Sequence, residues 1–599
     1  MTHSPSLQIL HDVFGFHDFR PGQSEIVERL TSGQNTLVVM PTGAGKSLCY
    51  QIPALMADRI TIIVSPLVAL MDDQVAALRA NGVAAACIHS GLPRHEQVAA
   101  WRDAAAGRCR LLYLSPERLM TRRMIEALQR LNPAMFIVDE AHCISKWGAS
   151  FRPEYEQLST LCELFPEAVI AGFTATADSA TRADIAQKLF RDKGKSIVHG
   201  FDRPNLRLAA AYKSQWKTQL LSFLSDKREM SGIVYCLSRK FTEEVTDYLC
   251  ASGVNAIAYH AGIDANKRRT NQSRFMTENA VVMVATIAFG MGIDKPDIRY
   301  VCHLNLPGSM EAYYQEIGRA GRDGEPAETL LLYDLSDMRQ RRMFIDQEDA
   351  DPDHKMREHK RLDALMAYAD AAQCRRMSLL AYFSETSGPC GNCDNCANPP
   401  RMTDRTRDAQ ILFTAIRQTG ESFGAAHVID VVCGAQTQKI RERGHDGLSG
   451  YGAGASKGKA YWQSCIRQLV SGNYLAIEIE RYGALRLTAR GENVMAGSES
   501  FALREAEPGR AVSTAPRAGV ARRLEDGDAQ LLADLKKCRM LLARERNVPA
   551  YVIFHDAVLQ DMAQTRPRTT DDLAKINGIG PKKLQDFGRV FLEIIRTSA

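Results

Sequence analysis

Short apolar runs rich in β-branched residues alternate with longer amphipathic stretches in the first part of the chain. The runs lie at Thr36–Met40, Ile60–Val64, Leu111–Leu114, Phe136–Val138 and Val169–Phe173. Buried strands of a parallel sheet read as continuous apolar runs, and the helical stretches between them are long enough to be crossover connections. The pattern predicts an α/β lobe with helices on both faces of a parallel sheet.

The same alternation starts again about thirty residues after the last of these runs. Its apolar runs lie at Gly232–Cys236, Ala256–Tyr259, Val281–Ala285, Tyr300–Leu304 and Thr329–Tyr333. We therefore expect a second α/β lobe, joined to the first near Phe201–Asn205.

Beyond Leu335 the pattern changes again. It is helical and charged as far as Phe383, a cysteine-rich segment follows, and residues 405–495 have the pattern of a small α+β unit. Gly497–Asp526 has no periodicity and is typical of a flexible linker, and the remainder is helical. The expected domains are 1–203 and 204–335 for the two lobes, 336–400 for a cysteine module, 401–496 for the α+β unit, 497–526 for the linker and 527–599 for a helical bundle.

Composition narrows the class of protein. The chain has 599 residues, of which 45% are hydrophobic and 24% charged, which is ordinary for a soluble protein with several cores. It has no apolar run of about 18 residues, which argues against a membrane span, and its N-terminus lacks the pattern of a signal peptide. Eleven of the 15 cysteines are scattered singly, as expected in a reducing cytosol. The net charge of +5 lies mostly in the C-terminal third, which favours a nucleic-acid surface there or reflects chance on small counts.

A phosphate-binding loop follows the first predicted strand. The strand runs directly into Pro41–Ser47, with a helix after it. Glycines let successive backbone N–H groups surround a phosphate, and the helix N-terminus adds positive potential. The residues assigned to nucleotide binding here are Thr42, Gly43, Gly45, Lys46 and Ser47. Lys46 would bind the β- and γ-phosphates and Ser47 would bind Mg²⁺.

Two further segments suit phosphoryl transfer from a nucleotide. Asp139 and Glu140 end a buried strand, where Asp139 suits Mg²⁺ coordination and Glu140 suits activation of water. Downstream, the segment 315–324 begins with Gln315 and is expected to present Arg319 and Arg322 on one helical face. Guanidinium groups from a second lobe can stabilise charge on a transferring phosphoryl group.

Four cysteines form a candidate metal site. Cys374, Cys390, Cys393 and Cys396 have the spacing C-x15-C-x2-C-x2-C. Such spacing can close a tetrahedron of thiolates around Zn²⁺. An iron–sulfur cluster and free thiols remain the alternatives.

These motifs together resemble superfamily-two helicases and, more narrowly, the bacterial RecQ DNA helicases. The most specific matches are Phe16–Gln23, the Asp-Glu-Ala-His box at Asp139–His142, the segment around Trp147 and the cysteine cluster. The resemblance covers essentially the whole chain. It implies two RecA-like lobes, a zinc-binding module, a winged-helix domain and a small helical HRDC-like bundle.

The resemblance also implies roles for individual residues. Gln23 would read adenine with Arg20 nearby and Phe16 stacking, Asp294 would meet the nucleotide, and Arg322 would be the arginine finger. The segments Ser65–Leu67, Ser115–Arg118 and Thr174–Thr176 resemble those that contact DNA or link it to ATP. In the second lobe the DNA-contacting residues would be Ser238, Arg239, His260 and Thr286.

One segment departs from the family pattern. Residues 147–155 resemble a loop that senses single-stranded DNA by base stacking, through Trp147, Phe151 and Arg152. Ala149-Ser150 stands where the family usually has His-Asp. We hypothesise that ATP hydrolysis depends less strictly on DNA here, and an equal stimulation ratio in an Ala149→His variant would reject this.

The C-terminal modules resemble accessory DNA-binding domains. Residues 405–500 resemble a winged helix, with a helix at Gly458–Ser471 and wing strands at Tyr474–Ile479 and Ala484–Leu487. Lys457, Lys459 and Arg467 would meet DNA phosphates or simply form a solvated basic face. In the HRDC-like bundle, the glycines of Asn577–Lys583 either expose N–H groups to a phosphate or only make a turn.

The sequence thus favours an ATP-driven DNA helicase using ATP, Mg²⁺ and Zn²⁺. The resemblance implies 3′→5′ travel and a role in recombination and repair. We expect single-stranded and duplex DNA as partners, single-strand-binding protein as a further candidate, no membrane partner, no obligate oligomer, and a bacterial cytoplasmic, nucleoid-associated location. The alternatives are an RNA-remodelling enzyme of the same superfamily and a DNA-binding scaffold with a degenerate ATPase.

Overall fold

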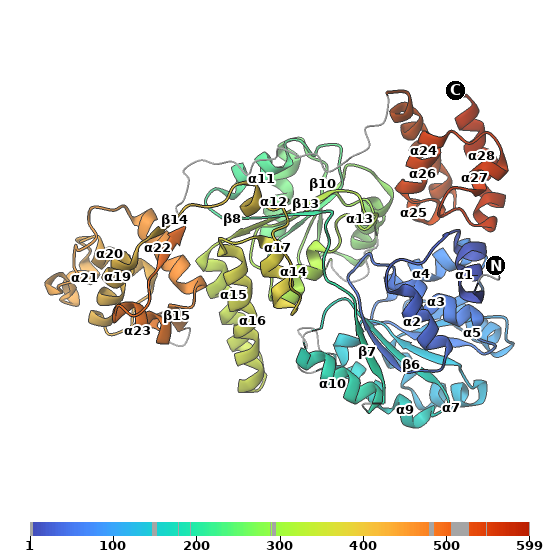
Figure 1. Ribbon diagram of the computed structural model, residues 1–599, viewed down its shortest axis with the longest axis horizontal. Coiled ribbons are helices and arrows are strands. Elements are labelled where there is room, and N and C mark those ends of the chain that lie inside the picture. The colour runs from blue at the N-terminus through green and yellow to red at the C-terminus, as the bar shows by residue number, and fades with distance from the viewer. Residues whose placement is uncertain are drawn as a thin grey trace.

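The chain folds into two α/β lobes and three smaller modules (Figure 1). The structure is a computed structural model that describes residues 4–145, 152–177, 179–191, 193–287, 289, 295–478, 484–504, 526–546 and 548–597. Within this part of the chain, every helix is too short or too polar to cross a bilayer.

The first lobe contains a seven-stranded parallel sheet with the strand order β3-β4-β2-β5-β6-β1-β7. Its strands are β1 (Thr36–Val39), β2 (Thr61–Val64), β3 (Ala85–Ile88), β4 (Leu111–Leu114), β5 (Met135–Val138), β6 (Val169–Thr174) and β7 (Lys195–Val198). Its helices are α1 (Pro5–Phe14), α2 (Gln23–Thr31), α3 (Lys46–Met56), α4 (Val68–Ala80), α5 (Arg94–Ala105), α6 (Pro116–Leu119), α7 (Arg122–Leu131), η1 (Ala141–Ile144), α8 (Pro153–Glu156), η2 (Gln157–Thr160), α9 (Leu161–Leu164) and α10 (Ser179–Phe190). β1 to β5 are buried along their whole length, as continuous apolar runs require.

The second lobe contains a six-stranded parallel sheet with the order β10-β11-β9-β12-β13-β8. Its strands are β8 (Leu206–Tyr212), β9 (Gly232–Tyr235), β10 (Ala256–Tyr259), β11 (Val282–Ala285), β12 (Tyr300–His303) and β13 (Ala327–Tyr333). Its helices are α11 (Trp216–Leu224), α12 (Arg239–Ala251), α13 (Ala265–Thr277) and α14 (Met310–Ile317). Each lobe has an open parallel sheet, which binds ligands at the carboxyl ends of its strands.

Two modules follow the second lobe and lie on the side away from the first (Figure 1). The cysteine module contains α15 (Leu335–Gln347), α16 (Pro352–Asp370), α17 (Arg375–Tyr382) and α18 (Asp394–Ala397). The next module contains β14 (Met402–Asp404), α19 (Thr406–Gln418), α20 (Ala425–Val432), α21 (Gln438–Glu442), η3 (His445–Gly447), α22 (Lys459–Ser471), β15 (Leu475–Glu478), β16 (Ala484–Leu487), α23 (Ala489–Met495) and β17 (Ala502–Arg504). The antiparallel pair β15–β16 follows α22, so the predicted helix and wing are confirmed.

The C-terminal bundle lies beside the first lobe, close to the N-terminus (Figure 1). It contains α24 (Asp526–Glu545), α25 (Ala550–Ile553), α26 (Asp556–Thr565), α27 (Thr570–Ala574) and α28 (Pro581–Thr597). Its core is separate from those of the lobes and includes Leu535, Leu559 and Phe591.

The predicted fold class is confirmed, and all ten predicted core strands are present. Five strands were not predicted: β3, β7 and β8 in the lobes, and β14 and β17, whose pairing places residues 502–504 in the winged-helix module rather than in the predicted linker. The edge strand β3 reads Ala-Ala-Cys-Ile, with a single β-branched residue, and β7 is largely exposed, so neither has the sequence signature of a central strand. Their places come from pairing with β4 and β1, which is a tertiary effect.

Candidate active site between the two lobes

The predicted P-loop connects β1 to α3. Gly43 and Gly45 both have a φ of +82°, in the left-handed region that glycine occupies without strain. A side chain at Gly45 would also place its Cβ only 2.5 Å from Gln23 Nε2. Lys46 begins α3, and its Nζ donates a hydrogen bond to the Met40 carbonyl at 3.0 Å. This is the geometry of a loop that binds phosphate with backbone N–H groups and a helix N-terminus.

The acidic pair lies at the same edge of the sheet as the P-loop. Asp139 and Glu140 follow β5, and only β6 separates β5 from β1. Burial and the Glu140 carboxylate raise the pKa of Asp139, whereas Lys46 opposes this shift. Burial also acts to raise the pKa of Glu140, but His142 and Lys46 hold it below its ordinary value. The Lys46 ammonium therefore faces both carboxyl groups.

A chain of polar contacts leads from the acidic pair to the second lobe. His142 Nδ1 lies 3.3 Å from Glu140 Oε2 and 2.9 Å from Thr174 Oγ1, at the end of β6. Thr174 Oγ1 in turn donates to the Thr176 carbonyl at 3.1 Å. Gln315 Nε2, from α14, donates to Thr176 Oγ1 at 2.8 Å. The side chains around the acidic pair are thus connected to the other side of the cleft.

The two arginines of the second lobe are not on a helix, so that part of the prediction is wrong. α14 ends at Ile317, and Arg319 and Arg322 lie in the turns that follow it. Gly321 and Gly324 have φ of +57° and +90°, which are incompatible with a continuing right-handed helix. The glycines around the arginines end the helix and let the chain turn toward the first lobe.

The structure nevertheless brings the arginine segment against the P-loop. Thr42 Oγ1 donates to the Gly318 carbonyl at 3.0 Å. A Cβ at Gly43 would lie 3.4 Å from the Arg322 Cα atom. Burial lowers the pKa of Lys46, and the nearby Arg322 charge lowers it further. The groups predicted to bind phosphate in one lobe and to neutralise its charge in the other therefore face each other.

The residues predicted to recognise adenine contact the P-loop directly. Gln23 Nε2 donates to the carbonyls of Ala44 and Gly45 at 3.1 and 3.2 Å. Arg20 Nη1 donates to the Gly43 carbonyl of the P-loop at 2.7 Å. Phe16, in the turn after α1, is half-buried. These hydrogen bonds join the base-side segment and the phosphate loop into one unit of the first lobe.

One residue of the cleft has no counterpart in the sequence analysis. Arg203, in the connector between β7 and β8, donates hydrogen bonds to carbonyls of both lobes. The only sequence signal was an Arg-Pro pair at a predicted lobe boundary, which does not distinguish a cleft residue from a surface one.

The four cysteines of the cysteine module converge. Their Sγ atoms all lie within 4.8 Å of one another, and those of Cys374 and Cys393 are 3.9 Å apart. A tetrahedral zinc ion with Zn–S bonds of about 2.3 Å spaces its sulfur atoms about 3.8 Å apart. Hydrogen bonds from the Cys390 thiol and from the backbone N–H groups of Arg375 and Cys396 lower the pKa of Cys393. The donor set and its spacing fit zinc.

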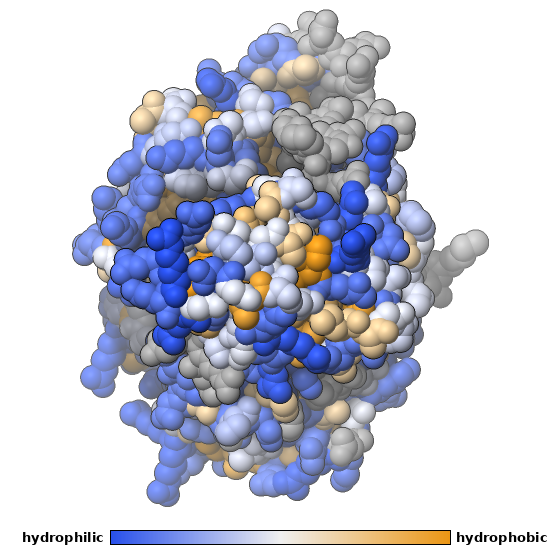
Figure 2. All heavy atoms as spheres, turned by 90° about the vertical axis from the view of Figure 1, so that its left-hand side faces the viewer, coloured by the Kyte–Doolittle hydropathy of each residue, from blue (hydrophilic) through white to orange (hydrophobic). Residues whose placement is uncertain are grey.

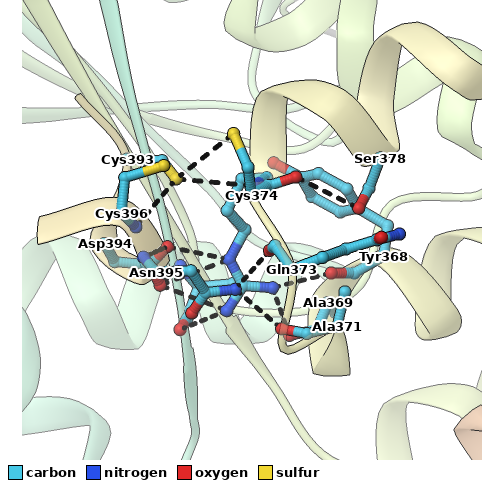
Figure 3. Close-up of polar contacts among 12 residues, drawn as sticks. Tyr368, Ala369, Ala371, Gln373, Cys374, Ser378, Cys393, Asp394, Asn395 and Cys396 are labelled. Carbon is cyan, nitrogen blue, oxygen red and sulfur yellow. Dashed lines mark hydrogen bonds and ion pairs between the residues drawn. The ribbon is translucent and has the colours of Figure 1, made fainter. Parts of the chain in front are cut away.

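Figure 3 shows Cys374, Cys393 and Cys396 beside Asp394, and a buried arginine, Arg375, fixes this cluster to its surroundings. Arg375 Nε donates to Asp394 Oδ1 at 2.9 Å, and Nη1 donates to the carbonyls of Tyr368 and Ala369 at 2.7 and 2.9 Å. Asp394 lies between two of the cysteines, and its Oδ2 also accepts from the Ala210 N–H in β8 at 3.1 Å. The cluster is therefore anchored both to α16 and to the sheet of the second lobe.

The residues of the second lobe that were predicted to contact DNA lie along one edge of its sheet. Ser238 and Arg239 follow β9, His260 follows β10 and Thr286 follows β11. These strands are parallel neighbours, so their carboxyl ends lie side by side. His260 is buried, and its Nε2 lies 3.2 Å from Glu243 Oε1. The arrangement allows a single nucleic-acid strand to follow this edge.

Part of the predicted DNA surface of the first lobe lies outside the described residues. Arg152 is described, and its Nη1 donates to the Pro66 carbonyl at 3.2 Å, within the Ser65–Leu67 segment. The predicted residues outside the description are Trp147, Ala149, Ser150 and Phe151 in the aromatic loop and Asp294 in the second lobe.

The three basic residues predicted in the winged helix have different environments. Lys459 is exposed and pairs with Asp430 at 2.6 Å, and Lys457 is half-buried and pairs with Asp408 at 2.6 Å. The Arg467 guanidinium is 9% exposed and bonded to Asp370 of α16 at 3.1 Å. It is therefore engaged between the modules rather than presented to DNA. Figure 2 views this end of the molecule, where hydrophilic residues predominate.

The glycine turn of the C-terminal bundle packs against the first lobe. The Gly578 N–H donates to the Gly15 carbonyl at 2.7 Å, and a Cβ at Gly15 would lie 2.5 Å from the Gly580 nitrogen. The neighbouring His17 N–H donates to Asn577 Oδ1 at 3.3 Å. The turn thus contacts the segment that contains Phe16, and the Gly578 N–H is used in this contact rather than exposed to a phosphate.

Comparison with known families finds a match within each lobe and each of the three smaller modules. The matching families are described as DEAD/DEAH box helicase (residues 20–185), Helicase conserved C-terminal domain (215–324), RecQ zinc-binding (335–397), RQC domain (399–511) and HRDC domain (528–595).

Curated relatives match over almost the full length. The chain is 41% identical to an ATP-dependent DNA helicase RecQ of Haemophilus influenzae, over 99% of this chain and 96% of that protein. It is 36% identical to the protein of the same name from Bacillus subtilis, over 100% of this chain and 99% of that protein. It is 30% identical to RecQ-like DNA helicase BLM of Xenopus laevis, over 98% of this chain and 46% of that protein. The chain belongs to the RecQ family of ATP-dependent DNA helicases.

Proposed function

We propose that this protein hydrolyses ATP in the cleft between its lobes and uses the cycle to move 3′→5′ along single-stranded DNA and to unwind duplex DNA. The observation that supports this most directly is the approach of the Arg322 segment to the P-loop across the cleft. Hydrolysis at such a site changes the contacts between lobes, because one lobe supplies the phosphate loop and the other supplies the arginines.

The chain's own residues divide the chemistry of hydrolysis. Lys46 would bind the β- and γ-phosphate oxygens, and Glu140, held ionised by His142 and Lys46, would orient the attacking water. Arg322 and Arg319 would stabilise the charge that develops on the transferred group. Phe16, Arg20 and Gln23 would hold the base and Asp294 would meet the nucleotide, as the family resemblance implies.

Ser47 and Asp139 fit a Mg²⁺ ion that accompanies the nucleotide. Burial and a neighbouring carboxylate disfavour the charged form of Asp139, and a divalent cation reverses this penalty. Bound Mg²⁺ neutralises charge on the β- and γ-phosphates. The four cysteines would hold zinc with all four ligand positions filled by protein, and a site with no open position suits a structural role.

The DNA path is proposed to follow the carboxyl-end edge of the second sheet and the aromatic loop of the first lobe. Ser238, Arg239, His260 and Thr286 would contact the strand together with Trp147, Phe151 and Arg152. Lys457 and Lys459 of the winged helix would meet duplex phosphates. Single-strand-binding protein is a proposed partner, and the bacterial cytoplasm, at the nucleoid, is the proposed location.

The polar chain from Glu140 through His142, Thr174 and Thr176 to Gln315 supports coupling between the site of hydrolysis and the lobes' relative position. We infer that a change around Glu140 would be transmitted to the hydrogen bond between Gln315 and Thr176. The DNA-contacting edge of that lobe belongs to the same sheet domain as α14.

Strand displacement tests the proposal. Labelled DNA duplexes with a 3′ or a 5′ single-stranded tail are compared with RNA duplexes of the same sequence, with ATP and Mg²⁺. We expect displacement of the 3′-tailed DNA only. Preferential displacement of the RNA duplexes would favour the RNA-remodelling alternative, and binding without ATP-dependent displacement would favour a scaffold.

A further inference from the structure

We propose that Arg203, in the connector between the lobes, is a positioning residue that holds the Arg322 segment against the P-loop. This inference rests on the proposed ATP hydrolysis. The guanidinium bridges the cleft by donating hydrogen bonds to main-chain carbonyls of both lobes. Its recorded hydrogen bonds, which include one to Asn205, do not involve Asp139 or Glu140.

The hydrogen bonds of Arg203 use the full fork of the guanidinium. Nη1 donates to the Thr42 carbonyl of the P-loop at 2.7 Å and to the Gly318 carbonyl at 3.3 Å. Nη2 donates to the carbonyls of Ala320 and Gly321 at 2.9 and 2.7 Å. One side chain thus binds the loop that receives phosphate and the four-residue stretch 318–321 immediately before Arg322. A lysine has a single ammonium and cannot reproduce this planar set of contacts.

Asn205 completes the arrangement from the same connector. Its Oδ1 accepts from Arg203 Nε at 3.4 Å, and its Nδ2 donates to the carbonyls of Gly321 and Glu325, each at 2.9 Å. Gly321 has a positive φ and no side chain that could fix its backbone. These side-chain bonds, together with the hydrogen bond from the Gly321 N–H to the Ile298 carbonyl at 2.9 Å, fix the course of this turn.

The connector itself is fixed from outside the cleft. The Phe201 ring stacks on Phe383 at 4.4 Å between centroids, and the Phe201 carbonyl accepts from the Tyr314 hydroxyl at 2.8 Å. The Phe201 N–H donates to Glu385 Oε2 at 2.6 Å, and Arg376 Nη1 donates to Asp202 Oδ1 at 3.1 Å. The connector that carries Arg203 into the cleft is thus held in place by contacts with the second lobe and with the cysteine module.

The electrostatics of the cleft support a role beyond packing. Burial lowers the pKa of Arg203 to about 10, and the nearby charges of Arg322 and Arg20 contribute. The group remains charged at neutral pH, although its acceptors are neutral carbonyls. Several cations concentrated beside the P-loop repel one another, and this repulsion is relieved when a polyphosphate binds. Arg203 is therefore placed where nucleotide binding changes the energy of its contacts.

The test compares ATP turnover in Arg203→Lys, Arg322→Ala and the double variant. Arg203→Lys is expected to lower kcat for DNA-stimulated ATP hydrolysis by roughly 10- to 100-fold, as for a small displacement of a catalytic group. KM for ATP and the affinity for a fluorescent ATP analogue should stay within about threefold, since the P-loop keeps its own contacts. Because Arg203 acts through Arg322, the double variant should be no slower than Arg322→Ala alone.

Two controls keep the result interpretable. Arg274→Lys changes an arginine that pairs with Glu278 on the surface of the same lobe, and it should leave turnover unchanged. Asn205→Ala should also lower kcat, but by less than Arg203→Lys does. It tests the role of the connector independently if Arg203→Lys folds poorly.

Three results would overturn the inference: unchanged kcat in both connector variants, a loss that appears in nucleotide affinity rather than kcat, or multiplicative losses in the double variant. A wild-type protein without ATP hydrolysis would instead refute the proposed function, so the two failures are distinguishable.

Discussion

Different interactions stabilise two regions of the molecule, the cleft between the lobes and the cysteine cluster. Across the cleft, the contacts are individual hydrogen bonds, such as that from Thr42 to the Gly318 carbonyl, whose residues are 276 positions apart, and that from Gln315 to the Thr176 hydroxyl. In the cluster, four thiols within 23 residues are backed by the buried Arg375–Asp394 ion pair. Single hydrogen bonds exchange readily for contacts with a ligand, whereas metal–thiolate bonds and a buried ion pair do not. The comparison indicates that the contacts across the cleft can rearrange, whereas the cysteine cluster stays fixed.

The largest expected difference between the two regions follows from Lys46→Ala. This change removes the charge that faces the acidic pair and the phosphates, so ATP turnover should fall by roughly 1,000-fold or more. The zinc content, measured by mass spectrometry of the metal, should stay the same because the cluster lies in another module. ATP turnover that survives in this variant would leave the cleft without its proposed role.

Cys393→Ser should produce the converse result. Loss of one thiolate opens the tetrahedron, and we expect loss of zinc with destabilisation of about 3 kcal/mol or more. Metal content and thermal unfolding of the variant and of Cys250→Ser, an exposed cysteine outside the cluster, give the measurement and its control. Retention of stoichiometric zinc in Cys393→Ser would contradict the assignment, and a brown colour with iron in the wild type would favour the iron–sulfur alternative.

Gln315→Ala tests the contact that connects the acidic pair to the second lobe. Because the hydrogen bond to Thr176 is lost, we expect the stimulation of ATP hydrolysis by single-stranded DNA to fall by about 10-fold. Turnover with and without DNA is compared with that of Gln219→Ala, whose amide caps a surface turn. Equal stimulation ratios in the two variants would show that the contact does not carry the coupling.

The smallest effect is expected from a substitution at the contact between the C-terminal bundle and the first lobe, which should change the docking of the bundle. Gly580 lies so close to the first lobe that a Cβ there would be 2.8 Å from the Val13 carbonyl. Gly580→Leu should therefore release the bundle and increase the radius of gyration in small-angle scattering, with zinc content unchanged. The matched change at Gly253→Leu, a left-handed glycine with no neighbour within 4 Å, should destabilise locally without releasing the bundle. An unchanged scattering profile for Gly580→Leu would argue against this docking.

The sequence predicted those features that depend on local patterns. The parallel strands, the P-loop, the acidic pair and the cysteine spacing each have a signature within a few residues. The helical face for Arg319 and Arg322 was wrong because the interspersed glycines outweigh helical spacing. Lys457 and Lys459 were assigned to phosphates or to a solvated basic face from their charge and the winged-helix resemblance, and their ion pairs with Asp408 and Asp430 appear only in the fold.

Long-range contacts were beyond prediction from the sequence. Nothing local to Arg467 indicates that it lies beside Asp370, and nothing local to Arg203 indicates that it bridges two lobes. The contact between Gly15 and Gly580 depends on the relative placement of the first and last modules. In each case the partner is chosen by tertiary packing, which leaves no periodic trace along the chain.

The most direct test of the account is a distance measurement between the lobes during the nucleotide cycle. Spin labels on non-natural amino acids at the exposed positions Arg123 and Lys240 report the separation of the lobes by pulsed electron resonance. We predict that the distance distribution of the wild type differs between ADP and a non-hydrolysable ATP analogue, and that Lys46→Ala gives one distribution for both. Identical distributions in all nucleotide states of a wild type that still unwinds DNA would contradict the account.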